Sequence, residues 1–213
     1  MIYHIVAGFI ASLFAILTFK KLDTFSRLIA MQVFISCLVE LTGWQFRIHG
    51  HTNTWLYNCY MPVEFTLLFA ATSLHFRKSL YPRMIATLIL YWVSWGFEIW
   101  YYGISTFAVH TYVIGAIILM VCYFFVLYKS AWSRNSLFNQ SLFWFSIGVL
   151  LFFGCSIPYL SMYDYIVEHS SRYQLELLTG LMKLLAQFRY LCTAIAFIVV
   201  FREVRRINIK SVA

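Results

Sequence analysis

The sequence predicts an all-α fold: a polytopic membrane protein that forms a bundle of seven transmembrane helices. The first observation is composition, because 62% of the 213 residues are hydrophobic and only 11% are charged, against about 25% charged in soluble domains. The second is that the apolar residues form continuous runs of the length that a helix needs to cross a hydrocarbon core about 30 Å thick. Continuous runs exclude a membrane β-barrel, whose strands alternate apolar and polar residues.

Seven runs have this length, and the links between them are short. We expect helices at about 2–19, 28–46, 55–76, 84–102, 106–128, 141–162 and 179–201. The first run has no cation before it and has Lys20 and Lys21 directly after it. This is the reverse of a secretory signal, so the run is expected to remain as the first helix. Residues 1–201 are therefore predicted to be one domain, followed by a short basic cytoplasmic tail at 202–213.

Local signals refine the third, sixth and seventh helices. Pro62 and Pro158 lie inside the third and sixth runs, and a proline cannot donate to the carbonyl one turn before it, so both helices are predicted to kink. Ser171 is followed three residues later by Gln174, the pattern of a capping box. The seventh helix is therefore expected to start before its apolar run, with first turns that stand above the membrane as part of a lid.

The cations predict the orientation. Twelve of the 16 lysines and arginines lie in the first, third and fifth links or in the tail. By the positive-inside rule, the N-terminus is expected outside and the C-terminus in the cytoplasm. The net charge of +8 is then a topology signal and an attraction to anionic lipid, not a sign of nucleic-acid binding. We expect a plasma membrane or bacterial inner membrane location.

Five ionisable residues lie inside the apolar runs. At about 1.5 Å of rise per residue, all five fall in the outer half or the midplane: Glu40, Glu64, Glu98, Lys183 and Arg189. An ionised side chain at the bilayer centre costs about 2.5–3.5 kcal/mol, so such groups usually face the bundle interior and find partners. Matching their depths predicts a structural ion pair between Arg189 and Glu64, and places Lys183 near Glu40 or Glu98.

Polar residues at helical spacing predict a pocket that opens outward between the second, third, fourth and seventh helices. Arg189 points about 120° away from the stripe of Lys183. We therefore expect Lys183 to face the pocket and Arg189 to lock the seventh helix to a neighbour. The first and fifth helices carry no such stripe and are expected to face lipid. The predicted lining is Glu40, Tyr60, Glu64, Glu98, Lys183, Gln187 and Tyr190.

Histidines and cysteines give weaker patterns, and no cofactor is predicted. His49 and His51 in the second link are candidates for metal ligation or pH sensing, although their spacing is not that of a known zinc motif. The alternative is that they are amphipathic residues at the membrane interface. The five cysteines lie in apolar runs without a C-x-x-C pair and are expected to be small packing groups.

Two resemblances concern layout. A lysine in the seventh helix (Lys183), a carboxylate in the third (Glu64) and an outside N-terminus resemble microbial rhodopsins, which implies retinal bound at the lysine. Thr179 stands where that family has a carboxylate one turn before the lysine. Length and helix number are also similar to those of small sugar transporters, whose proline-glutamine repeat is missing here.

The sequence predicts that the protein binds and transports a small solute or ion. In one version of this prediction, transport is coupled to the movement of a proton. Three carboxylates face two cations within the runs, so one carboxylate lacks a full cationic partner and is a natural protonation site. The alternative is a receptor-like or accessory subunit that recognises a ligand or another membrane protein, including a second copy of the chain. Enzyme motifs such as G-x-S-x-G and H-E-x-x-H are missing, so an intramembrane enzyme is the less favoured alternative, as is a retinal protein.

Overall fold

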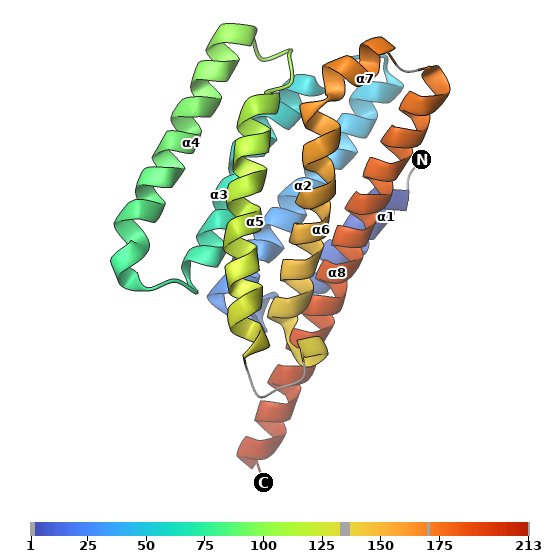
Figure 1. Ribbon diagram of the computed structural model, residues 1–213. Helices are drawn as coiled ribbons and strands as arrows, with labels where there is room; N and C mark the ends of the chain where they lie inside the picture. The colour runs from blue at the N-terminus through green and yellow to red at the C-terminus, as the bar shows by residue number, and fades with distance from the viewer. Residues whose placement is uncertain (1–2, 133–136, 170, 213) are drawn as a thin grey trace.

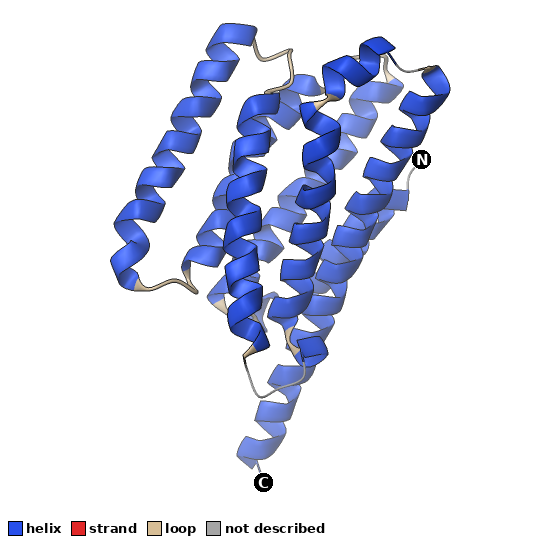
Figure 2. Ribbon diagram, viewed as in Figure 1, coloured by secondary structure: helices blue, strands red, loops and turns tan. Residues whose placement is uncertain are grey.

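The computed structural model describes residues 3–132, 137–169 and 171–212, and over these residues the chain is helical with short links and no strand (Figure 2). The predicted all-α class is therefore confirmed. Seven helices have 16 residues or more, and each overlaps one predicted run. They are α1 Tyr3–Thr18, α2 Thr24–Ile48, α3 Thr54–Ser73, α4 Tyr81–Tyr102, α5 Val109–Ala131, α6 Ser141–Ser161 and α8 Arg172–Val212.

Four of the described helices are long and apolar enough to cross a membrane: Thr24–Ile48, Val109–Ala131, Ser141–Ser161 and, within α8, Tyr173–Arg202. A fifth, Ile5–Thr18, is apolar but shorter. Length and composition thus support a membrane protein. The full count of seven spans remains a prediction.

Six of the helices form a closed ring. Each packs on the next in the order α1, α2, α3, α5, α6 and α8, and α8 returns to α1. Helix α4 stands outside this ring, against α3 and α5 (Figure 1). Only Tyr91 and Glu98 of α4 are buried. The first and fifth helices, which were predicted to face lipid, belong to this ring, and both also expose large apolar side chains such as Phe9 and Phe124.

Helix starts follow local capping. Helix α2 begins four residues earlier than predicted, where the carboxylate of Asp23 accepts a hydrogen bond from the Ser26 amide at 3.1 Å. At the start of α8, the Ser171 amide donates to Gln174 Oε1 at 2.8 Å and the Gln174 amide donates to Ser171 Oγ at 3.3 Å. The predicted capping box is confirmed, and α8 runs on through the residues predicted as a tail.

A short helix, α7, lies where only a link was predicted. It spans Tyr163–His169, and Figure 1 shows it beside the start of α8, at the end of the bundle where α2 finishes. Seven residues are fewer than two full periods of a helix. An apolar periodicity cannot be recognised in so short a segment, which is why the sequence did not show it.

One end of the ring is filled by apolar side chains. We call it the closed end; it is the end at which α3 finishes and α6 begins. Phe145 packs edge to face on Phe25 and Phe197, with ring centroids 5.7 and 5.2 Å apart. Lys129 Nζ donates to the carbonyl of His75 at 3.2 Å and so ties α5 to the link after α3. The largest fully buried apolar side chains here are Val33, Leu68, Leu119, Tyr123, Phe145 and Phe197.

A glycine brings α6 and α8 close together between the two ends. A Cβ on Gly148 would lie 3.0 Å from Cys192 Cβ and 3.4 Å from the carbonyl oxygen of Arg189. The contact with Cys192 Cβ is tighter than ordinary van der Waals contact, so a larger residue would push the helices apart. The backbone that carries Arg189 is therefore positioned directly by α6.

Candidate functional site

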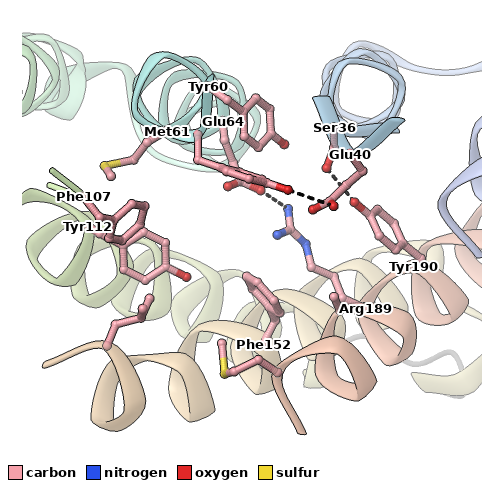
Figure 3. A pocket seen from close by; sticks show the side chains of 14 residues that line it. Ser36, Glu40, Tyr60, Met61, Glu64, Phe107, Tyr112, Phe152, Arg189 and Tyr190 are labelled. Carbon is pink, nitrogen blue, oxygen red and sulfur yellow. Dashed lines mark hydrogen bonds and ion pairs between the residues drawn. The ribbon is translucent and has the colours of Figure 1, made fainter. Parts of the chain in front are cut away.

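At the opposite end of the ring, which we call the cavity end, side chains leave a cavity of about 190 Å³. It lies between α2, α3, α5, α6 and α8, and Figure 3 shows it from close by. The predicted pocket therefore needs a correction, because α5 and α6 contribute to it and α4 does not. The lining residues are Ser36, Glu40, Tyr57, Tyr60, Met61, Glu64, Phe107, Tyr112, Phe152, Leu160, Met182, Ala186, Arg189 and Tyr190.

The cavity has a polar wall and an apolar wall. In Figure 3, Ser36, Glu40 and Tyr190 lie on one side of Arg189, whereas Met61 and Phe107 lie on the other. The charged side chains come from α2, α3 and α8, and α6 supplies only Phe152 and Leu160. A bound molecule would therefore meet charge on one side and apolar or aromatic surface on the other.

A buried ion pair forms the centre of the polar wall. Arg189 Nη2 lies 2.7 Å from Glu64 Oε1, and the two residues are only 7% and 9% exposed. The Gln32 side-chain amide donates to the same Glu64 oxygen at 3.0 Å and to the hydroxyl of Tyr60 at 2.8 Å. The structure thus brings together the pair that depth matching predicts. Gln32 fixes the carboxylate, and the pair joins α3 to α8.

Arg189 has more donor capacity than the pair uses. Its guanidinium lies over the rings of Phe152 and Phe153, with its central carbon 4.9 and 5.4 Å from their centroids, at distances that allow cation–π attraction. The ion pair engages Nη2, which is itself buried, whereas a guanidinium carries five N–H donors on three nitrogens. The donors on the other two nitrogens can therefore serve a bound molecule.

A second carboxylate lines the same cavity. The hydroxyl of Tyr57 donates to Glu40 Oε2 at 3.2 Å, and Ser36 and Tyr190 share a hydrogen bond of 2.6 Å between their hydroxyls. Gly43 allows Tyr57 to approach α2, since a Cβ there would lie 2.9 Å from the tyrosine hydroxyl. Figure 3 shows Arg189 pointing between Glu64 and Glu40, so three ionisable groups face one space.

The proline in α3 has a specific partner. Pro62 cannot donate to the carbonyl of Asn58, and the indole N–H of Trp95 on α4 donates to that oxygen instead, at 3.0 Å. Thr66 Oγ1 in turn donates to the Pro62 carbonyl at 2.6 Å. The unpaired carbonyl that the sequence predicts is therefore satisfied by α4, which anchors this peripheral helix to the ring. Pro158 lies in α6 and is exposed.

Glu98 serves the junction between α4 and α5 rather than the cavity. It accepts hydrogen bonds from the amides of His110 and Thr111 in the first turn of α5, at 3.0 and 2.8 Å, and its Oε1 lies 3.0 Å from His110 Nδ1. A helix N-terminus stabilises a carboxylate in this way. Asn58 holds the preceding loop by donating to the carbonyls of Ile104 and Thr106. Glu98 is thus compensated without Lys183.

Lys183 and Gln187 do not line this cavity, which corrects the predicted face of the seventh helix. The cavity face of α8 carries Met182, Ala186, Arg189 and the predicted Tyr190, whereas Gln187 lies on an apolar surface between α1, α6 and α8. Residues one apart are rotated by about 100° on a helix, so a stripe chosen one position away points at a different neighbour. Lys183 is not placed to hold a retinal in this cavity.

The candidate metal ligands are not among the residues that line the cavity. His49 and His51 are exposed after the end of α2. A ring nitrogen of His49 contacts the carbonyl of Gln45 at 2.8 Å, and the His51 ring lies against Phe46. Over the described residues, no three histidine, cysteine, aspartate or glutamate side chains gather where a metal ion could be held.

Several residues that line the cavity or hold its lining were not predicted from the sequence. Gln32 lies four residues before Ser36 and eight before Glu40, so it belongs to the polar stripe of α2 and could have been found by extending it. Phe152 and Tyr112 gave no signal, because an aromatic residue in an apolar run is as common on a lipid face as in a site.

The chain matches no protein-family model, and no curated protein or solved structure matches it.

Proposed function

We propose that the protein binds a small polar solute in this cavity and transports it across a membrane. The observation that carries the proposal is the buried guanidinium of Arg189, which lines the cavity while it is paired with Glu64. Buried ionisable groups within membrane helices are costly and usually mark a substrate or ion pathway. A purely structural ion pair needs no open space beside it, whereas this pair lines about 190 Å³.

The cavity end is proposed to face outside. The basic residues that predict the cytoplasmic side include Lys20, Arg77, Lys129 and Arg202, and these follow α1, follow α3, end α5 and lie in the distal part of α8. All four positions are at the closed end of the ring (Figure 1). The structure then corresponds to an outward-open state, with the apolar closed end as the barrier on the cytoplasmic side.

Glu64 is the proposed site of the coupled proton. An anionic group that binds Arg189 must compete with the carboxylate already 2.7 Å away. If Glu64 takes up a proton as the solute binds, its charge no longer competes, and no unpaired carboxylate is left in a low-dielectric site. Proton and solute would then occupy the cavity together and leave it together.

Proteoliposomes test this proposal. Vesicles that contain the purified chain and an internal pH dye should acidify when a transported solute is added outside, whereas vesicles with Glu64→Gln should take up solute without acidifying. Solute uptake by Glu64→Gln that still moves protons would remove Glu64 from the coupling role. A complete lack of solute and proton flux in wild-type vesicles would overturn transport.

A receptor-like or accessory subunit is the second candidate. It is favoured by the closed end, where side chains such as Phe145 and Phe197 are fully buried and pack on each other. This candidate predicts binding without flux, together with stoichiometric co-purification of another membrane protein. Flux through vesicles that contain this chain alone would exclude it as the sole function.

A further inference from the structure

We propose that the solute is a zwitterion of amino-acid size: an α-amino acid with an apolar side chain. This inference rests on the proposed binding function and adds the chemical class of the ligand. It follows from three features of one cavity, which are a guanidinium with donors beyond those of its ion pair, carboxylates beside it, and an apolar wall opposite. Each feature selects one part of such a molecule.

The guanidinium selects a carboxylate. Arg189 carries several N–H donors in a planar fork that matches the two oxygens of a carboxylate. Its Nη2 is paired with Glu64, which leaves the donors on Nε and Nη1, and Phe152 and Phe153 lie against the guanidinium. A ligand carboxylate would accept from these donors and would compensate the charge while Glu64 is protonated.

The carboxylates and phenols select a cationic donor. Glu40 lines the same cavity on the polar wall, and Tyr57 and Tyr190 flank it through hydrogen bonds to Glu40 and Ser36. A carboxylate can accept about four hydrogen bonds, so an ammonium group can share Glu40 with its existing contacts. With Arg189 between Glu64 and Glu40 (Figure 3), an ammonium next to a bound carboxylate falls beside Glu40.

The opposite wall and the volume select a short apolar side chain. Met61, Phe107 and Leu160 present thioether, aromatic and aliphatic surface to the cavity. A volume of about 190 Å³ corresponds to about six water molecules at roughly 30 Å³ each, below the range of roughly 300 Å³ and more that drug-sized ligands occupy. Flexible methionine side chains suit a range of side-chain shapes.

A matched series of ligands tests the inference on the unaltered protein. Binding to the full chain in lipid nanodiscs is measured by calorimetry for L-leucine, for 4-methylpentanoate, which lacks the amino group, and for 3-methylbutylamine, which lacks the carboxylate. Leucine should bind, and each of the other two should bind at least about tenfold more weakly, because each lacks one charge-assisted contact. The same order should hold for methionine and its two analogues.

The variant Glu40→Gln separates ligand recognition from structure. It should weaken leucine binding about tenfold and leave 4-methylpentanoate unchanged, because only leucine carries the ammonium that meets Glu40. A general disturbance of the fold would weaken both ligands equally. Equal loss for the two ligands would therefore count against this inference.

The remaining outcomes also decide the matter. Equal binding of leucine and 4-methylpentanoate would make the cavity an anion site, and equal binding of leucine and 3-methylbutylamine would make it a cation site; either overturns the zwitterion. If none of these ligands binds but the vesicles transport another solute, the inference fails and the proposed function stands. If nothing binds and no flux is found, both fail.

Discussion

Helices α6 and α8 pass through both ends of the ring, and they pack differently at each. At the closed end, Phe145 on α6 meets Phe197 on α8 edge to face at 5.2 Å, and both are fully buried. At the cavity end, Phe152 and Arg189 on the same two helices face about 190 Å³ of open space. The comparison shows that one helix pair packs tightly at one end and lines a cavity at the other, which is what the proposed binding function requires.

The ion pair should show the largest effect of any single change at the cavity end. Arg189→Leu leaves the Glu64 carboxylate buried without its cation, which should lower the free energy of unfolding by about 3–5 kcal/mol. Adding Glu64→Leu should recover most of this loss, because two apolar residues replace the pair. Reversible unfolding in detergent micelles measures both variants. A double variant that is less stable than Arg189→Leu would contradict the account of the pair.

The closed end should respond in stability alone. Phe197→Ala removes a fully buried ring that packs on Phe145. We expect a loss of about 2 kcal/mol, less than in a soluble core, because lipid is as apolar as the helix interior and only the packing part of the penalty remains. Solute binding, measured by calorimetry on the folded variant, should stay within twofold of wild type. A large loss of affinity would mean that the two ends are not separable.

The contact between α4 and the ring should have a smaller effect. Trp95→Phe removes the donor to the Asn58 carbonyl and should cost about 1 kcal/mol, the usual value for one hydrogen bond. In a Pro62→Ala background the same change should cost much less, since the new backbone N–H can serve that carbonyl. The free energies of unfolding of wild type, the two single variants and the double variant give the coupling energy between Trp95 and Pro62. If Trp95→Phe costs the same in both backgrounds, Trp95 does not act through this carbonyl.

Two glycines on α6 should differ in the sign of their effect. A Cβ at Gly148 would lie 3.0 Å from Cys192 Cβ, whereas at Gly154 it would meet only the end of Met120 at 3.4 Å or more. Gly154→Ala should stabilise by about 0.5–1 kcal/mol through helix propensity. Gly148→Ala should destabilise by about 0.5–1 kcal/mol and also weaken solute binding, because Arg189 shifts with α8. The melting temperatures of the two variants, measured in parallel with wild type, test this difference in sign. A rise in both would contradict it.

The fold was largely predictable because continuous apolar runs fix the helices, and the capping pair Ser171 and Gln174 fixes the start of α8. Depth along the helices was also informative, since counting residues matched Arg189 with Glu64. Rotation was not. The sequence leaves open which helices become neighbours, and an error of one position turns a stripe by about 100°. This is why Lys183 and Gln187 were assigned to the pocket in place of Met182 and Ala186.

The position of α4 had no signal in the sequence. Its polar residues follow the same spacing as those of the ring helices, yet Glu98 meets the start of α5 and Trp95 meets the Asn58 carbonyl. Both contacts join residues far apart in the chain. Spacing within one helix cannot distinguish a polar group that faces a cavity from one that fastens a neighbouring helix.

Two alanines on α8 allow the most direct test of an outward-open cavity. Ala186 lines the cavity, and Ala196, ten positions further along the same helix, is 0% exposed at the closed end. In a variant without the five native cysteines, Ala186→Cys and Ala196→Cys are treated with a membrane-impermeant thiol reagent from outside intact cells. The account predicts modification of Ala186→Cys only. An Ala186→Cys variant that reacts only from the cytoplasmic side, or not at all, would contradict it.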